Sequence, residues 1–299
     1  KKLSKELLNS KKELEELKNI NQELKTLENL NERMSKHIPP YEYDAYIKEN
    51  LFPLVFPISE KKQLNYNNLE VNIFKSSTPF LTGIDNKILS GSAYLDTYDN
   101  KLFLLSATGI IGFSNIKPDE IHFKQIQNNI ENFINENQFK KGKQFSIKDL
   151  KIFNNKVYVS YTEEKYKDCW TTSIIYSDLD YDELTFRKLF SPEECIPAVL
   201  NQGTYDGKLD ISKEFNAWQS GGRIIEFDDR HVLLTVGDYR ARFLAQKNDS
   251  LYGKILKINI NTAKSELISK GHRNPQGLLL DKNNNFILST EHGPKGGDE

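Results

Sequence analysis

The sequence of 299 residues contains only two cysteines, Cys169 and Cys195, and neither belongs to a CxxC or Cys/His pattern that would bind zinc. The two thiols either pair in an oxidising compartment or stay free and inert. A strong net charge is also missing, because 41 basic and 42 acidic residues leave a formal charge of -1. This balance offers no basic surface for a nucleic acid and does not select acidic substrates.

Long apolar runs are absent as well. No stretch approaches the roughly 20 residues of a membrane-spanning helix, and no cleavable signal segment is present. The first residue is Lys1 rather than methionine, which is compatible with a signal peptide or a membrane anchor upstream. A hydrophobic content of 37% is nevertheless enough for a real core, so we expect a folded chain of one large domain or two ordinary ones.

Residues 1–37 contain no glycine, proline, phenylalanine, tryptophan or tyrosine and are rich in Lys, Glu and Leu. Their leucines recur three or four residues apart, at Leu3, Leu7, Leu14, Leu17, Leu24 and Leu27. This spacing predicts a coiled-coil helix over residues 1–38 with a stutter, in which Asn21 at a core position sets the register of a dimer. The alternative is a solvated helix that packs on its own domain or on nothing. Pro39 and Pro40 end the helix.

The rest of the chain has a different pattern, in which short β-branched or aromatic runs alternate with Asn, Asp and Gly turns. Only residues 128–136 are expected to form a helix. Four segments share an apolar strand, a tight Asn/Asp turn and a second strand that ends on a hydroxyl residue. They are SAYLDTYDNKLFLLS, KDLKIFNNKVYVS, GRIIEFDDRHVLLT and QGLLLDKNNNFILST, with the matched hydroxyls at Ser106, Ser160, Thr235 and Ser289.

These hydroxyls are 54, 75 and 54 residues apart, a period typical of propeller blades. The larger gap predicts a loop insertion at about 190–218. A β-sandwich is the competing architecture, but it predicts no repetition of this length. We therefore predict an all-β chain in which residues 39–75 form a linker and propeller entry and residues 76–299 form part of a β-propeller.

Loops at one end of a propeller channel converge, so chemistry is expected there. The motif GHRNPQG, residues 271–277, places Arg273 and Asn274 at the entry of the last hairpin. A guanidinium beside an amide can hold a planar molecule with several oxygens. His272 and His292 lack the spacing of metal ligands and are expected to orient turns. Other basic residues, Arg240 and Arg242, either face the channel or belong to a solvated loop.

At these residues the sequence resembles a known family. GHRNPQGLLLD followed by STEHGPKGGDE is similar to the signature of the soluble glucose/sorbosone dehydrogenases, and SGGRIIEF, LLTVGDYRAR and LYGKILKINI occur in the family's order. The resemblance covers about residues 208–299. It implies a six-bladed β-propeller, C-terminally incomplete in this chain, that oxidises an aldose to its lactone by hydride transfer to pyrroloquinoline quinone. A periplasmic or membrane-associated location is also implied.

The resemblance also implies roles for individual residues. Arg273 and Asn274 would lie against the edge of the quinone. The backbone carbonyls of Gly293 and Pro294 would bind the calcium ion that joins the cofactor to the protein. The acidic end of the motif, Asp298 and Glu299, is either a second calcium site or a solvated loop end.

One position departs from the family pattern. The family's proton-accepting histidine lies four residues before the arginine of the GGR motif, and Gln219 stands there in this sequence. Glutamine cannot act as a general base near neutral pH. Either another group takes the proton, with Glu214 and Asp210 as the nearest carboxylates, or ordinary sugar oxidation is lost.

Two functions are therefore predicted. The first is a quinone-dependent oxidoreductase that acts on an aldose. The second is a catalytically silent propeller that binds a sugar or a protein partner and becomes multivalent by self-association through residues 1–37.

Overall fold

The computed structural model describes residues 48–56, 58–67, 69–76, 93–116, 121–134, 147–198 and 215–293, together with isolated positions between 11 and 25. The isolated positions are helical, and the remainder of the predicted coiled coil lies outside the described residues. Strands dominate the rest, so the all-β prediction is confirmed. The helix predicted at 128–136 is wrong in its described part, because only the single 3-10 turn η1, Ile130–Asn132, forms there.

The first two sheets have their strands in nearly sequential order. The first sheet runs β1-β7-β6-β5-β4, with β1 Leu54–Phe56, β4 Ala93–Tyr98, β5 Lys101–Ser106, β6 Ile111–Asn115 and β7 Ile121–Gln125. The second sheet runs β13-β11-β10-β9, with β9 Ile147–Phe153, β10 Lys156–Tyr166, β11 Cys169–Asp178 and β13 Arg187–Phe190. A short strand, β14 Ile196–Pro197, pairs with β11.

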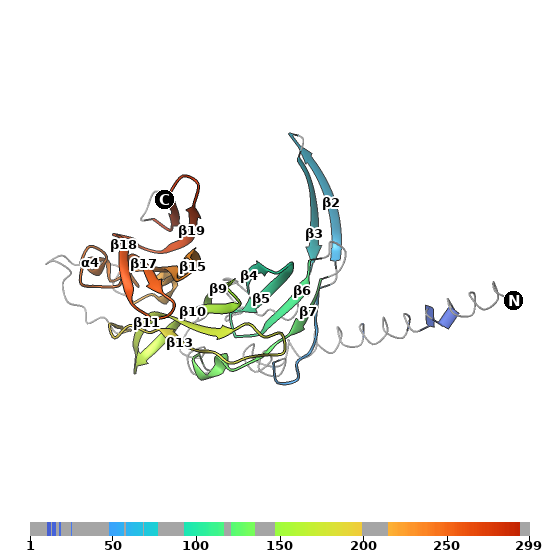
Figure 1. Cartoon of the computed structure of the whole chain (residues 1–299), viewed down its shortest axis with the longest axis horizontal. Coiled ribbons are helices and arrows are strands. Elements are labelled where there is room, and N and C mark those ends of the chain that lie inside the picture. Colours follow the sequence, from blue (N-terminus) through green and yellow to red (C-terminus); the bar gives the residue numbers. More distant parts are fainter. Residues whose placement is uncertain are drawn as a thin grey trace.

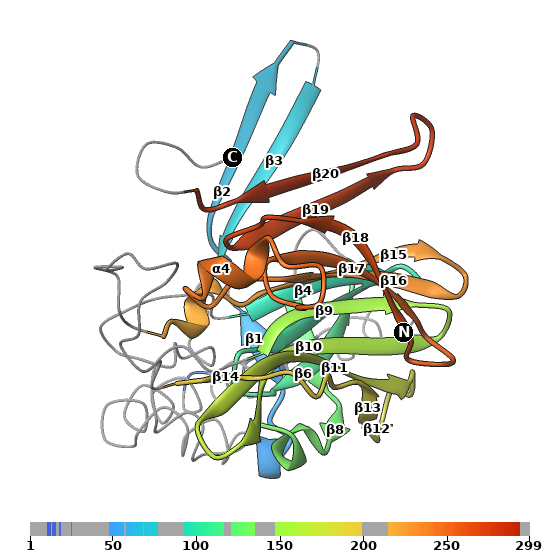
Figure 2. The same cartoon turned by 90° about the vertical axis from the view of Figure 1, so that its left-hand side faces the viewer.

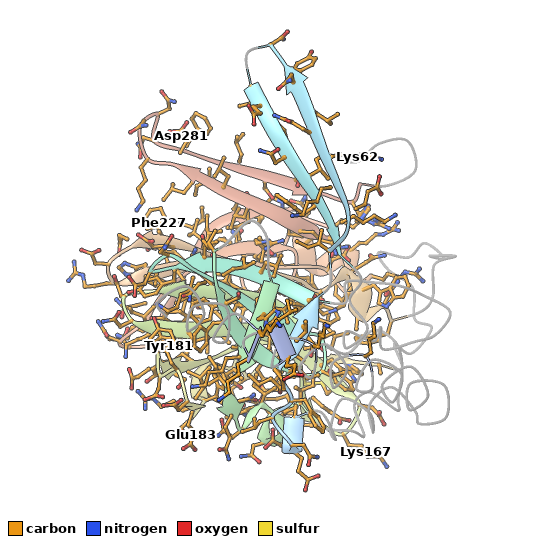
Figure 3. All side chains as sticks on the ribbon, turned by 90° about the vertical axis from the view of Figure 1, so that its right-hand side faces the viewer. Lys62, Lys167, Tyr181, Glu183, Phe227 and Asp281 are labelled. Atoms are coloured by element: carbon orange, nitrogen blue, oxygen red, sulfur yellow. A yellow bond between two sulfur atoms is a disulfide. The ribbon has the colours of Figure 1, made fainter. Side chains whose placement is uncertain are left out.

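The C-terminal part contains one complete sheet and one hairpin. The complete sheet runs β15-β16-β17-β18, with β15 Gly221–Asp228, β16 His231–Val236, β17 Lys254–Asn259 and β18 Ser265–Lys270. The hairpin consists of β19 Pro275–Asp281 and β20 Phe286–Glu291. A separate hairpin, β2 Ile58–Tyr66 and β3 Leu69–Ser76, projects from the body (Figure 1), with Lys62 on it in Figure 3. Two short strands, β8 Gln127–Asn128 and β12 Glu183–Leu184, pair in parallel.

The four hairpins predicted from the repeated pattern are β4–β5, β9–β10, β15–β16 and β19–β20. The first strand of each hairpin is an edge strand of its sheet. The turn residues Asp99, Asn100, Asn154 and Asn155 all have positive φ, between 48° and 56°. Two successive residues with positive φ define the type I′ turn, which Asn and Asp tolerate and which matches the twist of paired strands. The Asn/Asp turns of the sequence therefore fix the register of the first two hairpins.

The first strands of successive sheets lie next to one another. Strand β4 contacts β9, β9 contacts β15, and β15 contacts β19, so the sheets follow each other around a common side as blades do (Figures 1 and 2). Apolar side chains fill the space between adjacent sheets in two clusters, one around Phe103, Leu150 and Val159 and the other around Trp170, Ile224 and Leu256. The β-propeller prediction is confirmed.

Buried polar side chains join the inner strands of adjacent blades. The carboxylate of Asp149 on β9 accepts the backbone N–H of Ile224 on β15 at 2.8 Å and Nη1 of Arg223 at 2.8 Å. In the same way Asp96 on β4 accepts the N–H of Ile152 on β9 at 2.6 Å. Burial raises the pKa of Asp149 to about 6, although Arg223 opposes this effect. Each carboxylate thus replaces water for a backbone group that has no ladder partner.

Two of the matched hydroxyl side chains also join adjacent blades. Ser160 donates to the carbonyl of Gly222 in the next blade, and Thr235 donates to the carbonyl of Pro275 at 2.8 Å. The other two, Ser106 and Ser289, bond within their own blades. The repeated hydroxyl is therefore a blade-to-blade contact only where the second and third blades meet their successors.

The structure settles the state of the two cysteines, which the sequence left open: Cys169 and Cys195 form a disulfide with Cα atoms 5.4 Å apart. The bond ties the start of β11 to the segment before β14. In the part of the chain that the structure describes, no helix is long and apolar enough to cross a membrane.

We predict that Asp149→Ala weakens the contact between the second and third blades. The substitution leaves the buried N–H of Ile224 without an acceptor, which costs about 2 kcal/mol of unfolding free energy. Urea denaturation at neutral pH measures this loss. The control is Asp182→Ala, because Asp182 is 83% exposed and its pair with Lys124 contributes less than about 1 kcal/mol. Equal effects of the two variants would contradict the prediction.

Candidate functional site

Three segments distant in sequence meet where the third and fourth blades adjoin. The 3-10 turn η2, Ala217–Gln219, precedes β15, and the side chain of Asn216 caps it by accepting the N–H of Trp218 at 2.9 Å. The loop after β16 donates through the N–H of Asp238 to the carbonyl of Arg273 at 2.8 Å. The same loop donates through the N–H of Tyr239 to the carbonyl of Gln219 at 2.9 Å. Backbone bonds therefore fix the three segments against each other.

Arg273 is the hub of this site. Its Nη1 donates to the carbonyl of His292 at 2.8 Å and to the carbonyl of Gly293 at 2.9 Å. Its Nε is buried and has no hydrogen-bond partner among the described residues. A buried donor without an acceptor is rare and costly in a folded protein, so this N–H marks a place where an oxygen-bearing ligand would be stabilising.

Asn274 lies next to Arg273, as predicted, and is 4% exposed. Its side-chain oxygen accepts the N–H of Gly221 at 3.2 Å, and its backbone carbonyl accepts the N–H of His292 at 3.3 Å. The amide nitrogen of the side chain is left as a donor. The pair thus presents a guanidinium and an amide nitrogen from one short turn.

Gln219 is brought into the same cluster. In the amide orientation that satisfies both neighbours, its nitrogen donates to Oδ1 of Asp238 at 3.1 Å and its oxygen accepts Nη2 of Arg273 at 3.1 Å. Gln219 is therefore a neutral bridge between a carboxylate and a guanidinium. It can hold both groups in place, but it cannot take a proton.

Asp238 is a residue of the candidate site that the sequence analysis did not predict. It is 1% exposed, and burial raises its pKa to about 6 while the N–H of Arg240 and the charges of Arg242 and Arg273 oppose the rise. Glu291 acts with burial to raise this pKa further. Asp238 lies within the motif TVGDYRAR, between a glycine and two arginines.

Glu291 is the second residue that was missed. One oxygen, Oε2, accepts the N–H groups of Arg273 at 2.8 Å and Asn274 at 3.3 Å. The other, Oε1, lies 3.5 Å from Nδ1 of His272. His272 therefore orients a turn, as predicted, and the acidic residue of STEHGP supports the turn that carries the candidate site.

A glycine is required where the segments approach most closely. A Cβ atom on Gly237 would lie 2.0 Å from the carbonyl oxygen of Gln219, a distance no side chain can occupy. Gly221 adopts a φ of 63°, which favours glycine. These two positions let η2 and the loop after β16 pack directly against each other.

A partly buried lysine lies beside η2. Nζ of Lys148 on β9 donates to the carbonyl of Ala217 at 3.4 Å, and burial lowers the pKa of this amine to about 8. No motif in the sequence distinguishes this lysine from the others.

Several predicted residues cannot be placed. Pro294, Asp298 and Glu299, predicted to bind metal, and the alternative bases Glu214 and Asp210 lie outside the described residues. Among the residues that are described, no group of three or more His, Cys, Asp or Glu side chains could hold a metal ion. Of the predicted calcium ligands only Gly293 is described, and its carbonyl faces Arg273.

Comparison with known proteins gives one family match. The model of the glucose/sorbosone dehydrogenase family matches residues 151–299. The aldose sugar dehydrogenase YliI of Escherichia coli is 33% identical over 92 residues, and an uncharacterised protein, slr1608, of Synechocystis is 33% identical over 102 residues. Each alignment covers 26% of this chain and 25% of the relative.

Two solved structures share the fold over a longer range. A glucose dehydrogenase matches with a TM-score of 0.50 and 22% identity over 69% of this chain and 59% of its own. The pyrroloquinoline-quinone-bound aldose sugar dehydrogenase of Streptomyces coelicolor matches with a TM-score of 0.51 and 18% identity over 69% of this chain and 58% of its own. The chain thus spans less than two thirds of these proteins.

We predict a pH dependence of stability that originates at Asp238. Its folded pKa of about 6 lies above the ordinary value of 3.8, so the native state binds more protons than the unfolded state between these two pH values. The carboxylate therefore lowers the stability of the native state as pH rises from about 4 to about 6. Asp238→Asn lacks this titration.

The measurement is urea unfolding of both proteins at several pH values. The unfolding free energy of the wild type, relative to Asp238→Asn, should fall by about 3 kcal/mol across this window, since one pKa unit corresponds to about 1.4 kcal/mol. A relative stability that is flat or rises with pH would contradict the assignment.

Proposed function

Because residues 151–299 belong to the glucose/sorbosone dehydrogenase family, we propose that the chain is part of a quinone-dependent sugar dehydrogenase. The proposed substrate is an aldose in its cyclic hemiacetal form, and the proposed product is the lactone. Pyrroloquinoline quinone is the proposed cofactor, with calcium as the ion that joins it to the protein.

The observation that carries this proposal is the unpaired N–H of Arg273 beside the amide of Asn274. Nε of Arg273 is buried and has no partner among the described residues. A planar cofactor rich in carbonyl and carboxylate oxygens would supply the missing acceptor, and Asn274 would bind a neighbouring oxygen. When bound, the quinone supplies a two-electron acceptor for the hydride of the sugar.

The residues of this chain would contribute binding and charge. The guanidinium of Arg273 is held on the side away from Nε by the carbonyls of His292 and Gly293, so it presents a fixed donor with positive charge. A fixed donor stabilises negative charge without a cost of reorganisation during the reaction. In this proposal the carbonyls of Gly293 and Pro294 would also bind the calcium ion, whose preference is for oxygen ligands.

Oxidation of the sugar also requires a group that accepts the proton of its hydroxyl. Gln219 stands where the family's histidine is expected, and its amide is already shared between Asp238 and Arg273. This arrangement favours the second candidate function, a propeller that binds a sugar or a protein partner without oxidising it. Self-association through residues 1–37 would make such a protein multivalent.

The proposed location is the periplasm or the surface of a membrane. The disulfide between Cys169 and Cys195 supports an oxidising compartment, because such bonds persist mainly outside the cytoplasm.

We predict that Gln219→His raises the rate of aldose oxidation by about two to four orders of magnitude. An imidazole at this position would lie within hydrogen-bond reach of Asp238, which would orient the ring and stabilise its protonated form. The measurement is dye reduction by the full chain with pyrroloquinoline quinone, calcium and a panel of aldoses. Gln219→Asn is the matched control, because asparagine takes no proton either.

The same assay separates the two candidate functions. Turnover by the wild type supports the dehydrogenase. Turnover by Gln219→His alone supports a site built for this reaction and a wild-type protein that is catalytically silent. Absence of both quinone binding and turnover in all variants would overturn the proposed function.

A further inference from the structure

Two motifs of the site, GHRNPQG and STEHGP, are joined by hydrogen bonds in both directions. Glu291, at the end of β20, accepts the backbone N–H groups of Arg273 and Asn274. Arg273 in turn donates through its side chain to the backbone carbonyls of His292 and Gly293. The side chain of Glu291 thus binds the backbone of the first motif, and the side chain of Arg273 binds the backbone of the second.

We infer that Glu291 is the positioning residue that holds Arg273 and Asn274 in the geometry needed to bind the quinone. The inference rests on the proposed function for the identity of the ligand. The carbonyls of Arg273 and Asn274 already accept the N–H groups of Asp238 and His292, so the N–H groups of the turn are the part that depends on Glu291.

The reason for this dependence lies in the strand pairing. Pro275 is the first residue of β19 and is paired with Glu291 in the register of the hairpin. Proline has no N–H, so it donates no ladder bond at this position. The N–H groups of the two preceding residues lie beyond the ladder, and the Glu291 carboxylate supplies an acceptor for both.

The charges around Glu291 match this role. Its second oxygen faces His272, whose Nε2 lies 2.9 Å from Oγ of Ser269, so the histidine is fixed from the other side. The side chain of Glu291 is 14% exposed. A carboxylate in this setting forms charge-assisted bonds to both N–H groups, which are stronger than bonds between neutral groups.

The test compares Glu291→Ala with Glu291→Gln in the full chain. Two quantities are measured: hydrogen exchange of the Arg273 and Asn274 amides by NMR without any cofactor, and the affinity for pyrroloquinoline quinone from quenching of tryptophan fluorescence. Trp218 lies beside Gln219 and serves as the local probe.

We expect Glu291→Ala to speed exchange at the two amides by at least about tenfold and to weaken quinone binding by about 10- to 100-fold, as loss of a supporting group commonly does. Glu291→Gln keeps a side-chain carbonyl as acceptor but loses the charge, so it should fall between the wild type and Glu291→Ala in both measurements. Glu266→Ala is the matched control, because Glu266 on β18 is 63% exposed and forms an ion pair with Lys257.

The outcomes separate the inference from the proposed function. Exchange at Arg273 and Asn274 that is unchanged in Glu291→Ala overturns the inference. So does faster exchange throughout β15 and β16, because the role would then be general stability. Failure of the wild type to bind quinone overturns the proposed function and, with it, the assignment of the ligand, while local faster exchange would still show that Glu291 holds the turn.

Discussion

The arrangement of this protein depends on buried polar side chains that bond the inner strand of one blade to the backbone of the next. Apolar packing between sheets is not directional and would tolerate sliding. The hydrogen bonds of Asp149 do not tolerate sliding. The carboxylate needs both the N–H of Ile224 and the guanidinium of Arg223 to offset its own desolvation. Asp96 and Thr235 act in the same way at the neighbouring interfaces. These bonds join specific residues of adjacent blades and so restrict how the blades can move against each other.

The candidate site is held by hydrogen bonds of the same kind between adjacent blades. Arg223 is tied by Asp149 on one side, and its Nε donates to the carbonyl of Gln276 in the fourth blade at 3.0 Å. The GGR motif is therefore fixed relative to the turn that carries Arg273 and Asn274. Gln219, four residues before Arg223, inherits that position and meets Asp238 and Arg273. The chemistry at the site is thus decided by a blade interface and not by one loop.

Sequence reasoning found the elements that repeat. The four hairpins and their Asn/Asp turns were predicted and are confirmed among the described residues, and Arg273 lies against the carbonyls of His292 and Gly293. It missed Asp238 and Glu291, since a single acidic residue in a glycine-rich motif has the appearance of a solvated loop end. Their importance comes from burial and from partners that lie far away along the chain.

The sequence by itself determined the strand–turn–strand order of the hairpins. Turn type and strand alternation are local properties that Asn, Asp and β-branched residues impose within about 15 residues. It also determined that no histidine stands at position 219. Only the tertiary structure decided what Gln219 contacts, whether Cys169 pairs with Cys195, and which groups stabilise Arg273. These are contacts across blades, and their energies depend on burial and distance, which no local pattern specifies.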